Sequence, residues 1–166
     1  MYTPALGYWN NPEGTEKLLR GGWLHTGDQG LIDAENNLFV RARRNDLIVR
    51  GGANVYPAEV EYTIQKDLRI KHCAVLGVPD ERLGQRVAAV LEFQDVTTAK
   101  DQLLMDLHEH CARHLARFKV PSDWFVTAHM PLNAMHKVMK PVLLLQMAEE
   151  ALGLPWRPPK PDRPTG

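Results

Sequence analysis

Hydrophobic and polar residues alternate differently in three stretches of the chain. In residues 1–44, glycine, asparagine and aromatic residues are frequent, and helical spacing of apolar residues is nearly confined to residues 13–19. Two strand-like runs, residues 30–33 and 38–41, flank the polar segment 34–37. This pattern predicts a β-hairpin with a polar turn.

The second stretch, residues 45–153, contains helical patterns. Pro57 is typical of a first helical position. The apolar residues after it recur at Val60, Ile64 and Leu68, which predicts one helix.

Two more helices and four strands are expected in the same stretch. One helix is predicted over residues 100–115, with one apolar face, and another from Pro141 to about residue 152. Strands are predicted for the runs 46–49, 72–78, 86–93 and 124–127. Strands and helices do not alternate in regular βαβ order. The pattern therefore predicts an α+β fold with a short antiparallel sheet and flanking helices.

The last stretch, residues 154–166, differs from both others in composition. It contains five prolines and little apolar surface to bury. We expect an extended or disordered Pro-rich tail.

Composition and charge narrow the classes of function. Hydrophobic residues make up 44% of the 166 residues, enough for a packed core, and 20 basic residues balance 20 acidic ones. A neutral chain has no global attraction for nucleic acid or anionic membrane, and no apolar run approaches the ~20 residues that span a bilayer. With two cysteines outside any metal-site spacing and no signal-peptide pattern at its start, the chain is expected to be cytoplasmic.

Two glycine-rich segments invite a close approach of the backbone to a ligand. In residues 21–30, the Asp28 carboxylate could accept hydrogen bonds from paired hydroxyls such as those of a ribose. An Asx turn capping the hairpin is the alternative, and residue chemistry alone favours it. Gly51 and Gly52 stand between a strand and a helix, where a tight connection and a thin ligand are both consistent with the sequence.

Histidines in the predicted helix 100–115 suggest a metal site at first sight. His110 and His114 are one helical turn apart, with His108 and Cys111 nearby. No acidic or thiolate cluster completes a tetrahedral set, so no metal site is predicted.

Six motifs in order resemble the signature series of the adenylate-forming enzymes, and they cover about residues 7–151. The motifs Gly-Trp-Leu-His-Thr-Gly-Asp and Gly-Gly-x-Asn-Val-Tyr-Pro are similar to those of the fatty- and aryl-CoA synthetase branch. The six motifs are residues 7–15, 22–28, 43–61, 77–80, 115–121 and 131–137.

The resemblance implies a two-step reaction. ATP, with Mg²⁺, activates a carboxylic acid as an acyl-adenylate and releases pyrophosphate, and the thiol of CoA then displaces AMP. It also implies a domain order. Residues 1–44 would end a large AMP-binding domain, residues 45–153 would form a small C-terminal lid that rotates between the half-reactions, and residues 154–166 would be the tail.

By motif position, the resemblance assigns nucleotide and hinge roles. Asp28 would hold the ribose hydroxyls of ATP, and Arg43 would lie near the same ribose or the phosphate. Asn45 falls at the hinge, where the family usually has Asp or Lys.

The resemblance assigns catalysis to Lys137, whose ammonium would stabilise charge on the α-phosphate and carboxylate oxygens during adenylation. His136 precedes it, where the family usually has glycine, and this departure could stiffen the loop. Gly52 would line the tunnel for the pantetheine arm of CoA. Lys119, with Arg117, lies in the motif nearest the CoA phosphates of some relatives.

The family's phosphate-binding loop and acyl pocket are absent from this sequence. We therefore expect the chain alone to be inactive and to need an N-terminal AMP-binding domain as partner, and the acid stays unidentified. The alternative is a non-catalytic module that binds CoA, a nucleotide or a partner, and a fragment without function is a third hypothesis. Unpaired strand edges before residue 45 could pair between chains and give a homo-oligomer.

Overall fold

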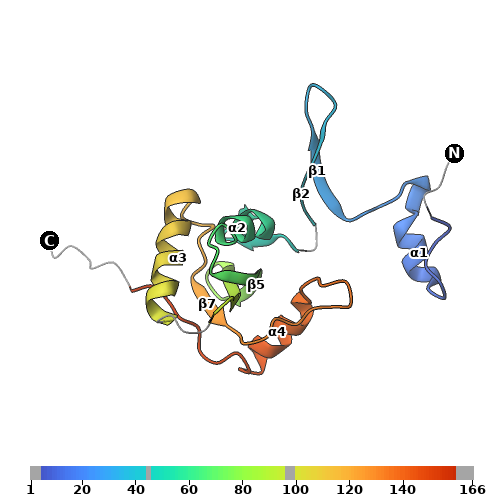
Figure 1. Cartoon of the computed structure of the whole chain (residues 1–166). Helices are drawn as coiled ribbons and strands as arrows, with labels where there is room; N and C mark the ends of the chain where they lie inside the picture. The colour runs from blue at the N-terminus through green and yellow to red at the C-terminus, as the bar shows by residue number, and fades with distance from the viewer. Residues whose placement is uncertain (1–4, 44–45, 96–99, 160–166) are drawn as a thin grey trace. The chain divides into compact units, whose positions relative to one another are not determined.

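The computed structural model describes residues 5–43, 46–95 and 100–159, without the side chains of residues 41–43. The chain separates into two compact units, Met1–Asn45 and Asp46–Gly166 (Figure 1). In chain order the elements are α1 (Pro12–Leu18), η1 (Arg20–Gly22), β1 (Asp28–Ile32), β2 (Leu38–Arg43), β3 (Ile48–Arg50), β4 (Ala53–Val55), α2 (Pro57–Ile64), β5 (Ile70–Asp80), β6 (Gly84–Phe93), α3 (Lys100–His114), β7 (Asp123–Val126) and α4 (Lys140–Ala148).

The first unit consists of a short helix and a hairpin. Helix α1 begins at the N-cap Asn11, whose side chain accepts from the Gly14 N–H at 2.8 Å. Strands β1 and β2 pair antiparallel, as the sequence predicted. At the turn, Asp33 Oδ1 accepts from the N–H groups of Glu35 and Asn37, at 3.0 and 2.8 Å.

The first unit has no core of its own in its described part. None of residues 5–40 is buried, and the side chains of Leu6 and Trp9 are 97% and 98% exposed. Trp23 is also largely exposed. Exposure of large apolar side chains to water is unfavourable in free energy, and contact with a neighbouring surface would remove this penalty.

The second unit is built on a five-stranded sheet of order β4-β3-β6-β5, with β7 beside β6. Strands β5 and β6 form its longest hairpin, with β6 inside the sheet and β5 at its edge, and their pairing from residue 70 to 93 is antiparallel. Strand β7 departs from the expected antiparallel sheet, because it runs parallel to β6 after the crossover through α3. The α+β class itself is confirmed.

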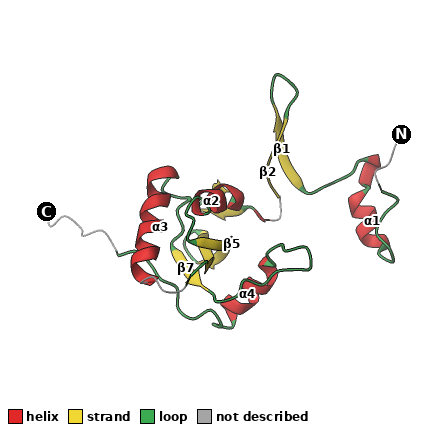
Figure 2. Ribbon diagram, in the orientation of Figure 1, coloured by secondary structure: helices red, strands yellow, loops and turns green. Residues whose placement is uncertain are grey.

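Both faces of this sheet are covered, so its two longest strands, β5 and β6, bury successive residues on opposite sides. On one face Val75 and Ala89 pack with α2 and α3, through side chains such as Leu104. On the other face Ala74 and Leu143, the latter from α4, share a smaller cluster. Figure 2 shows α4 on the other side of the strands from α3. This two-sided burial explains why the middle parts of β5 and β6, residues 73–78 and 87–91, are continuously apolar.

Three details differ from the sequence expectations. Helix α2 ends at Ile64, so Leu68 lies outside the helix and is 89% exposed. Strand β5 continues to Asp80 and β6 begins at Gly84, so both strands are longer than the predicted runs 72–78 and 86–93. In the tail, Trp156 packs against the larger core and pairs with Trp124. Among the described helices, none combines the length and the apolar character that a bilayer crossing requires.

Candidate functional site

Lys137 lies on a closed loop that leads into α4. Leu132 and Val138 form a bridge at the base of the loop, and the Asn133 N–H donates to the Lys137 carbonyl at 2.9 Å. At the tip, His136 has a φ of +57°. The Lys137 side chain is exposed, so the fold presents a cation at the end of a hydrogen-bonded loop.

Gly51 and Gly52 form the turn between β3 and β4, with φ values of +55° and +82°. A Cβ added to Gly52 would meet no atom within 4 Å. The positive φ explains glycine as a turn residue, and the open space in front of it also leaves room for a thin ligand. Both sequence interpretations therefore fit this geometry.

Lys119 is held within the unit by an ion pair. Its Nζ lies 2.6 and 2.8 Å from the two carboxylate oxygens of Glu59, in the first turn of α2. The Lys119 side chain is only 21% exposed. Its charge is thus already partnered, unlike that of an open surface lysine.

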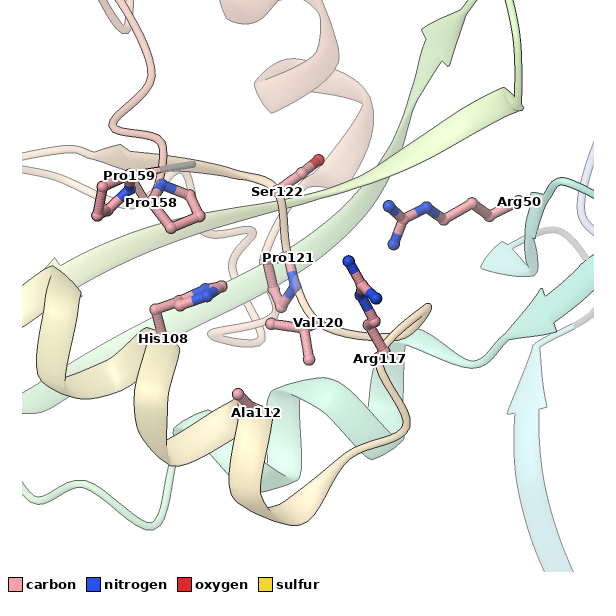
Figure 3. Close-up of a pocket in the computed structure, with 9 residues that line it drawn as sticks. All are labelled: Arg50, His108, Ala112, Arg117, Val120, Pro121, Ser122, Pro158 and Pro159. Carbon is pink, nitrogen blue, oxygen red and sulfur yellow. The ribbon is translucent and has the colours of Figure 1, made fainter. Parts of the chain in front are cut away.

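A cavity of about 620 Å³ opens in the second unit, between α3, the turn after it and residues 158–159 (Figure 3). Two guanidinium groups, of Arg50 and Arg117, line it and lie together in Figure 3. Arg50 is fixed because its Nη1 donates to the Phe118 carbonyl at 2.7 Å. The other lining residues are His108, Ala112, Val120, Pro121, Ser122, Pro158 and Pro159. Two arginines beside apolar walls suit an anion attached to an apolar or planar group.

His108 lies at the wall of this cavity between two indoles. Its ring centroid is 6.3 Å from that of Trp124 and 6.2 Å from that of Trp156, edge-on to both. Its Nδ1 is buried without a hydrogen-bond partner. Burial lowers the pKa of His108 below its ordinary value of 6.5, although the charge of Glu109 opposes this, so the ring is neutral near pH 7.

The residues expected to hold the nucleotide belong to the first unit. Asp28 and Arg43 are directly opposite in the β1–β2 register, so the hairpin brings these two positions together. The Asp28 N–H donates to Thr26 Oγ1 at 3.1 Å, which orders the chain entering β1. The Arg43 side chain and the whole of Asn45 lie outside the described residues.

Sequence reasoning missed Arg50 and His108 as site residues, and it named Arg117 only through its motif. The three lie far apart in the chain, on β3, on α3 and in the turn after α3. No spacing rule joins them, since the packing of α3 on the sheet creates their proximity. Where the chain is described, no group of three His, Cys, Asp or Glu side chains could hold a metal ion.

Residues 59–137 match the model of the AMP-binding enzyme C-terminal domain. The chain is 38% identical over 136 residues to the long-chain-fatty-acid–CoA ligase FadD13 of Mycobacterium tuberculosis, covering 82% of this chain and 26% of that relative. It is 37% identical to the 2-succinylbenzoate–CoA ligase of a Geobacillus species, over 81% of this chain and 27% of the relative.

Among solved structures, this chain is likewise similar to CoA synthetases. The o-succinylbenzoate CoA synthetase MenE of Bacillus subtilis, in complex with its acyl-adenylate intermediate, superposes with a TM-score of 0.74 at 34% identity. The match covers 83% of this chain and 28% of that one. The chain therefore spans about a quarter of the length of the curated relatives that it matches.

Proposed function

We propose that this chain, the C-terminal part of an adenylate-forming enzyme of the acyl- and aryl-CoA synthetase branch, acts as the lid of an acid–thiol ligase. In the proposed reaction a carboxylate oxygen attacks the α-phosphorus of ATP and pyrophosphate leaves. The CoA thiol, losing its proton, then attacks the acyl carbon, and AMP leaves. The single observation that carries the proposal is the exposed Lys137 on its closed loop, within a domain of this family.

Lys137 is proposed to act in the first half-reaction. Negative charge builds on the α-phosphate and carboxylate oxygens in the transition state, and an ammonium placed there stabilises it more than it stabilises the separated substrates. A lysine on a loop rather than in the core can enter and leave the site as the lid moves.

Gly52 and the arginine cavity are proposed to serve the second half-reaction. The open space at the Gly52 turn supports a path for the pantetheine arm, which a side chain would narrow. Lys119 remains a proposed CoA contact, although its ammonium would have to leave Glu59 to reach a phosphate. Arg50 and Arg117 already face the cavity, so they are the better proposed partners for the CoA phosphates.

The first unit is proposed to be the end of the large domain, with Asp28 and Arg43 holding the ribose and Asn45 acting as the hinge. The absence of buried residues among residues 5–40 supports this, because the exposed apolar side chains there need another surface. Mg²⁺ would arrive with ATP. Since the described residues offer no cluster to hold it, its ligands are expected from ATP and the N-terminal domain.

A second candidate is a CoA-binding module without catalysis. One observation favours it: the cavity with two arginines lies entirely within the second unit and needs nothing from a large domain. Titration of the 166-residue chain with CoA and with AMP would discriminate. Tight, saturable binding by the chain alone favours the module, and weak binding favours the lid.

The ligase proposal is tested by joining this chain to the large domain of the FadD13 relative and measuring pyrophosphate release with a panel of carboxylic acids. Lys137→Ala is expected to lower the rate by about 10²–10³-fold, the loss typical of one transition-state donor. Lys66→Ala, at an exposed lysine after α2, is the matched control and should change little. Pyrophosphate release that is unchanged in Lys137→Ala would overturn the assignment of Lys137.

A further inference from the structure

The loop that carries Lys137 is organised by one side chain, that of Asn133. We propose that Asn133 is a positioning residue for Lys137, and this inference rests on the ligase function proposed above. Asn133 does not reach the reacting atoms in this proposal. It acts by fixing the backbone from which Lys137 extends.

The geometry of the loop centres on residue 133. The Asn133 Oδ1 accepts from the Met135 N–H and from the Lys137 N–H, both at 2.9 Å. Its backbone N–H donates to the Lys137 carbonyl at 2.9 Å, and its carbonyl accepts from the His136 N–H at 2.9 Å. A single amide oxygen therefore uses both lone pairs on the loop, and one of its donors is the backbone of Lys137 itself.

The base of the loop is rigid. The Met139 N–H donates to the Pro131 carbonyl at 2.8 Å, and Leu143, one turn into α4, is fully buried. Lys140 is 2.9 Å from Glu61 Oε1, which ties the start of α4 to α2. Because the base is fixed, any freedom of Lys137 arises at the tip, where Asn133 provides the acceptors.

The backbone at the tip of the loop is strained at His136, and the hydrogen bonds of Asn133 help to maintain this conformation. His136 lies in the left-handed region with a φ of +57°, a conformation that residues other than glycine avoid. Without the Asn133 oxygen, the Met135 and Lys137 N–H groups would bond to water instead, and His136 could relax to a negative φ. Lys137 would then start from several backbone positions, whereas adenylation requires one.

The first test is amide hydrogen exchange on the 166-residue chain. Asn133→Ala is expected to speed exchange at Met135 and Lys137 by at least tenfold, with the core amides of β5 and β6 unchanged. Asn133→Asp offers the same acceptor geometry and should restore slow exchange. Gln94→Ala, at an exposed amide side chain elsewhere in the unit, is the matched control. Unchanged exchange in Asn133→Ala would overturn the proposal.

The second test separates positioning from general damage. In the chimera with the FadD13 large domain, Asn133→Ala should lower kcat for pyrophosphate release by about 10–100-fold with little change in KM. Thioester formation from a preformed acyl-adenylate and CoA should keep its rate, because Lys137 is assigned to the first step only. Equal loss in both half-reactions would indicate a structural role and overturn the inference. If Lys137→Ala has no effect on adenylation, the assignment of Lys137 fails, whatever Asn133 does. A chimera that releases no pyrophosphate with any acid would instead overturn the ligase proposal.

Discussion

His136 has a left-handed backbone next to the proposed catalytic lysine, with a φ of +57°. Histidine is one of the residue types found there more often than most, yet an L-residue still loses about 1–2 kcal/mol relative to its preferred conformation. The family that the sequence resembles usually has glycine at this position. The structure gives a physical reason for that preference, because glycine adopts a positive φ without the strain that histidine bears.

The strain at His136 can be measured. His136→Gly should raise the free energy of unfolding by up to about 1 kcal/mol, because relief of the left-handed strain exceeds the added entropy of the unfolded chain. Ala134→Gly is the matched control, since Ala134 has no positive φ, and it should lower stability by about 0.5–1 kcal/mol. Urea unfolding of both variants decides the point. Equal destabilisation would mean that His136 is unstrained.

At the residue scale, sequence could predict some roles and not others. The Gly51–Gly52 turn could be predicted because glycine adopts a positive φ without strain, and this preference is visible in the local sequence. Lys137 was assigned from a motif, and its role stays a prediction. The pairing of Arg50 with Arg117 in one cavity, and the partnering of Lys119 by Glu59, depend on how α2 and α3 pack. Contacts between residues that are distant in the sequence cannot be predicted from a local pattern.

At the element scale, residues 155–159 behave as a strap rather than as part of a free tail. Trp156 exchanges two backbone hydrogen bonds with Trp124 in β7, at 3.0 and 2.8 Å. Arg157 is 2.5 Å from Asp123, whose side chain is only 1% exposed. Prolines do not prevent this, because the strap lies at the outer side of β7. A count of prolines predicted an extended segment but missed the tryptophan that anchors it.

The free energy of unfolding should depend on the charge of His108. Its ring lies edge-on to Trp124 in β7 and to Trp156 in the strap. Its pKa is lowered in the fold, so below about pH 6.5 the unfolded chain binds more protons and the free energy of unfolding falls as pH decreases. The effect is bounded by about 1.4 kcal/mol per pH unit. Asp67 and Asp106, whose pKa values are lowered from 3.8, titrate in a more acidic window.

His108→Phe isolates that contribution. The phenyl ring keeps the contact with the indoles and cannot be protonated, so the fall in stability between pH 7 and pH 5.5 should be smaller than in the unmodified chain. Urea unfolding followed by tryptophan fluorescence measures it. The same pH dependence in both proteins would contradict the role of His108.

At the scale of the whole molecule, the two units differ in whether they can fold alone. The second unit buries two clusters, one on each face of its sheet. In the first unit, residues 5–40 contain no buried residue, and its helix and hairpin rely on local hydrogen bonds. The sequence predicted a boundary near residue 45, because apolar residues rarely follow helical spacing before it. Under the proposal, the surface that covers the first unit lies on the N-terminal domain, so no local pattern of this chain could describe it.

Independent folding of the second unit is the prediction that follows from this difference. In limited proteolysis of the chain, bonds before residue 46 should be cut first, because an unpacked backbone opens at little cost in free energy. A fragment of residues 46–159 should survive, and alone it should unfold cooperatively with a Tm close to that of the second unit in the full chain. Sparing of the first forty residues while the later region is cut would contradict this. It would mean that the first unit has found its missing surface, in another copy of the chain or on the second unit.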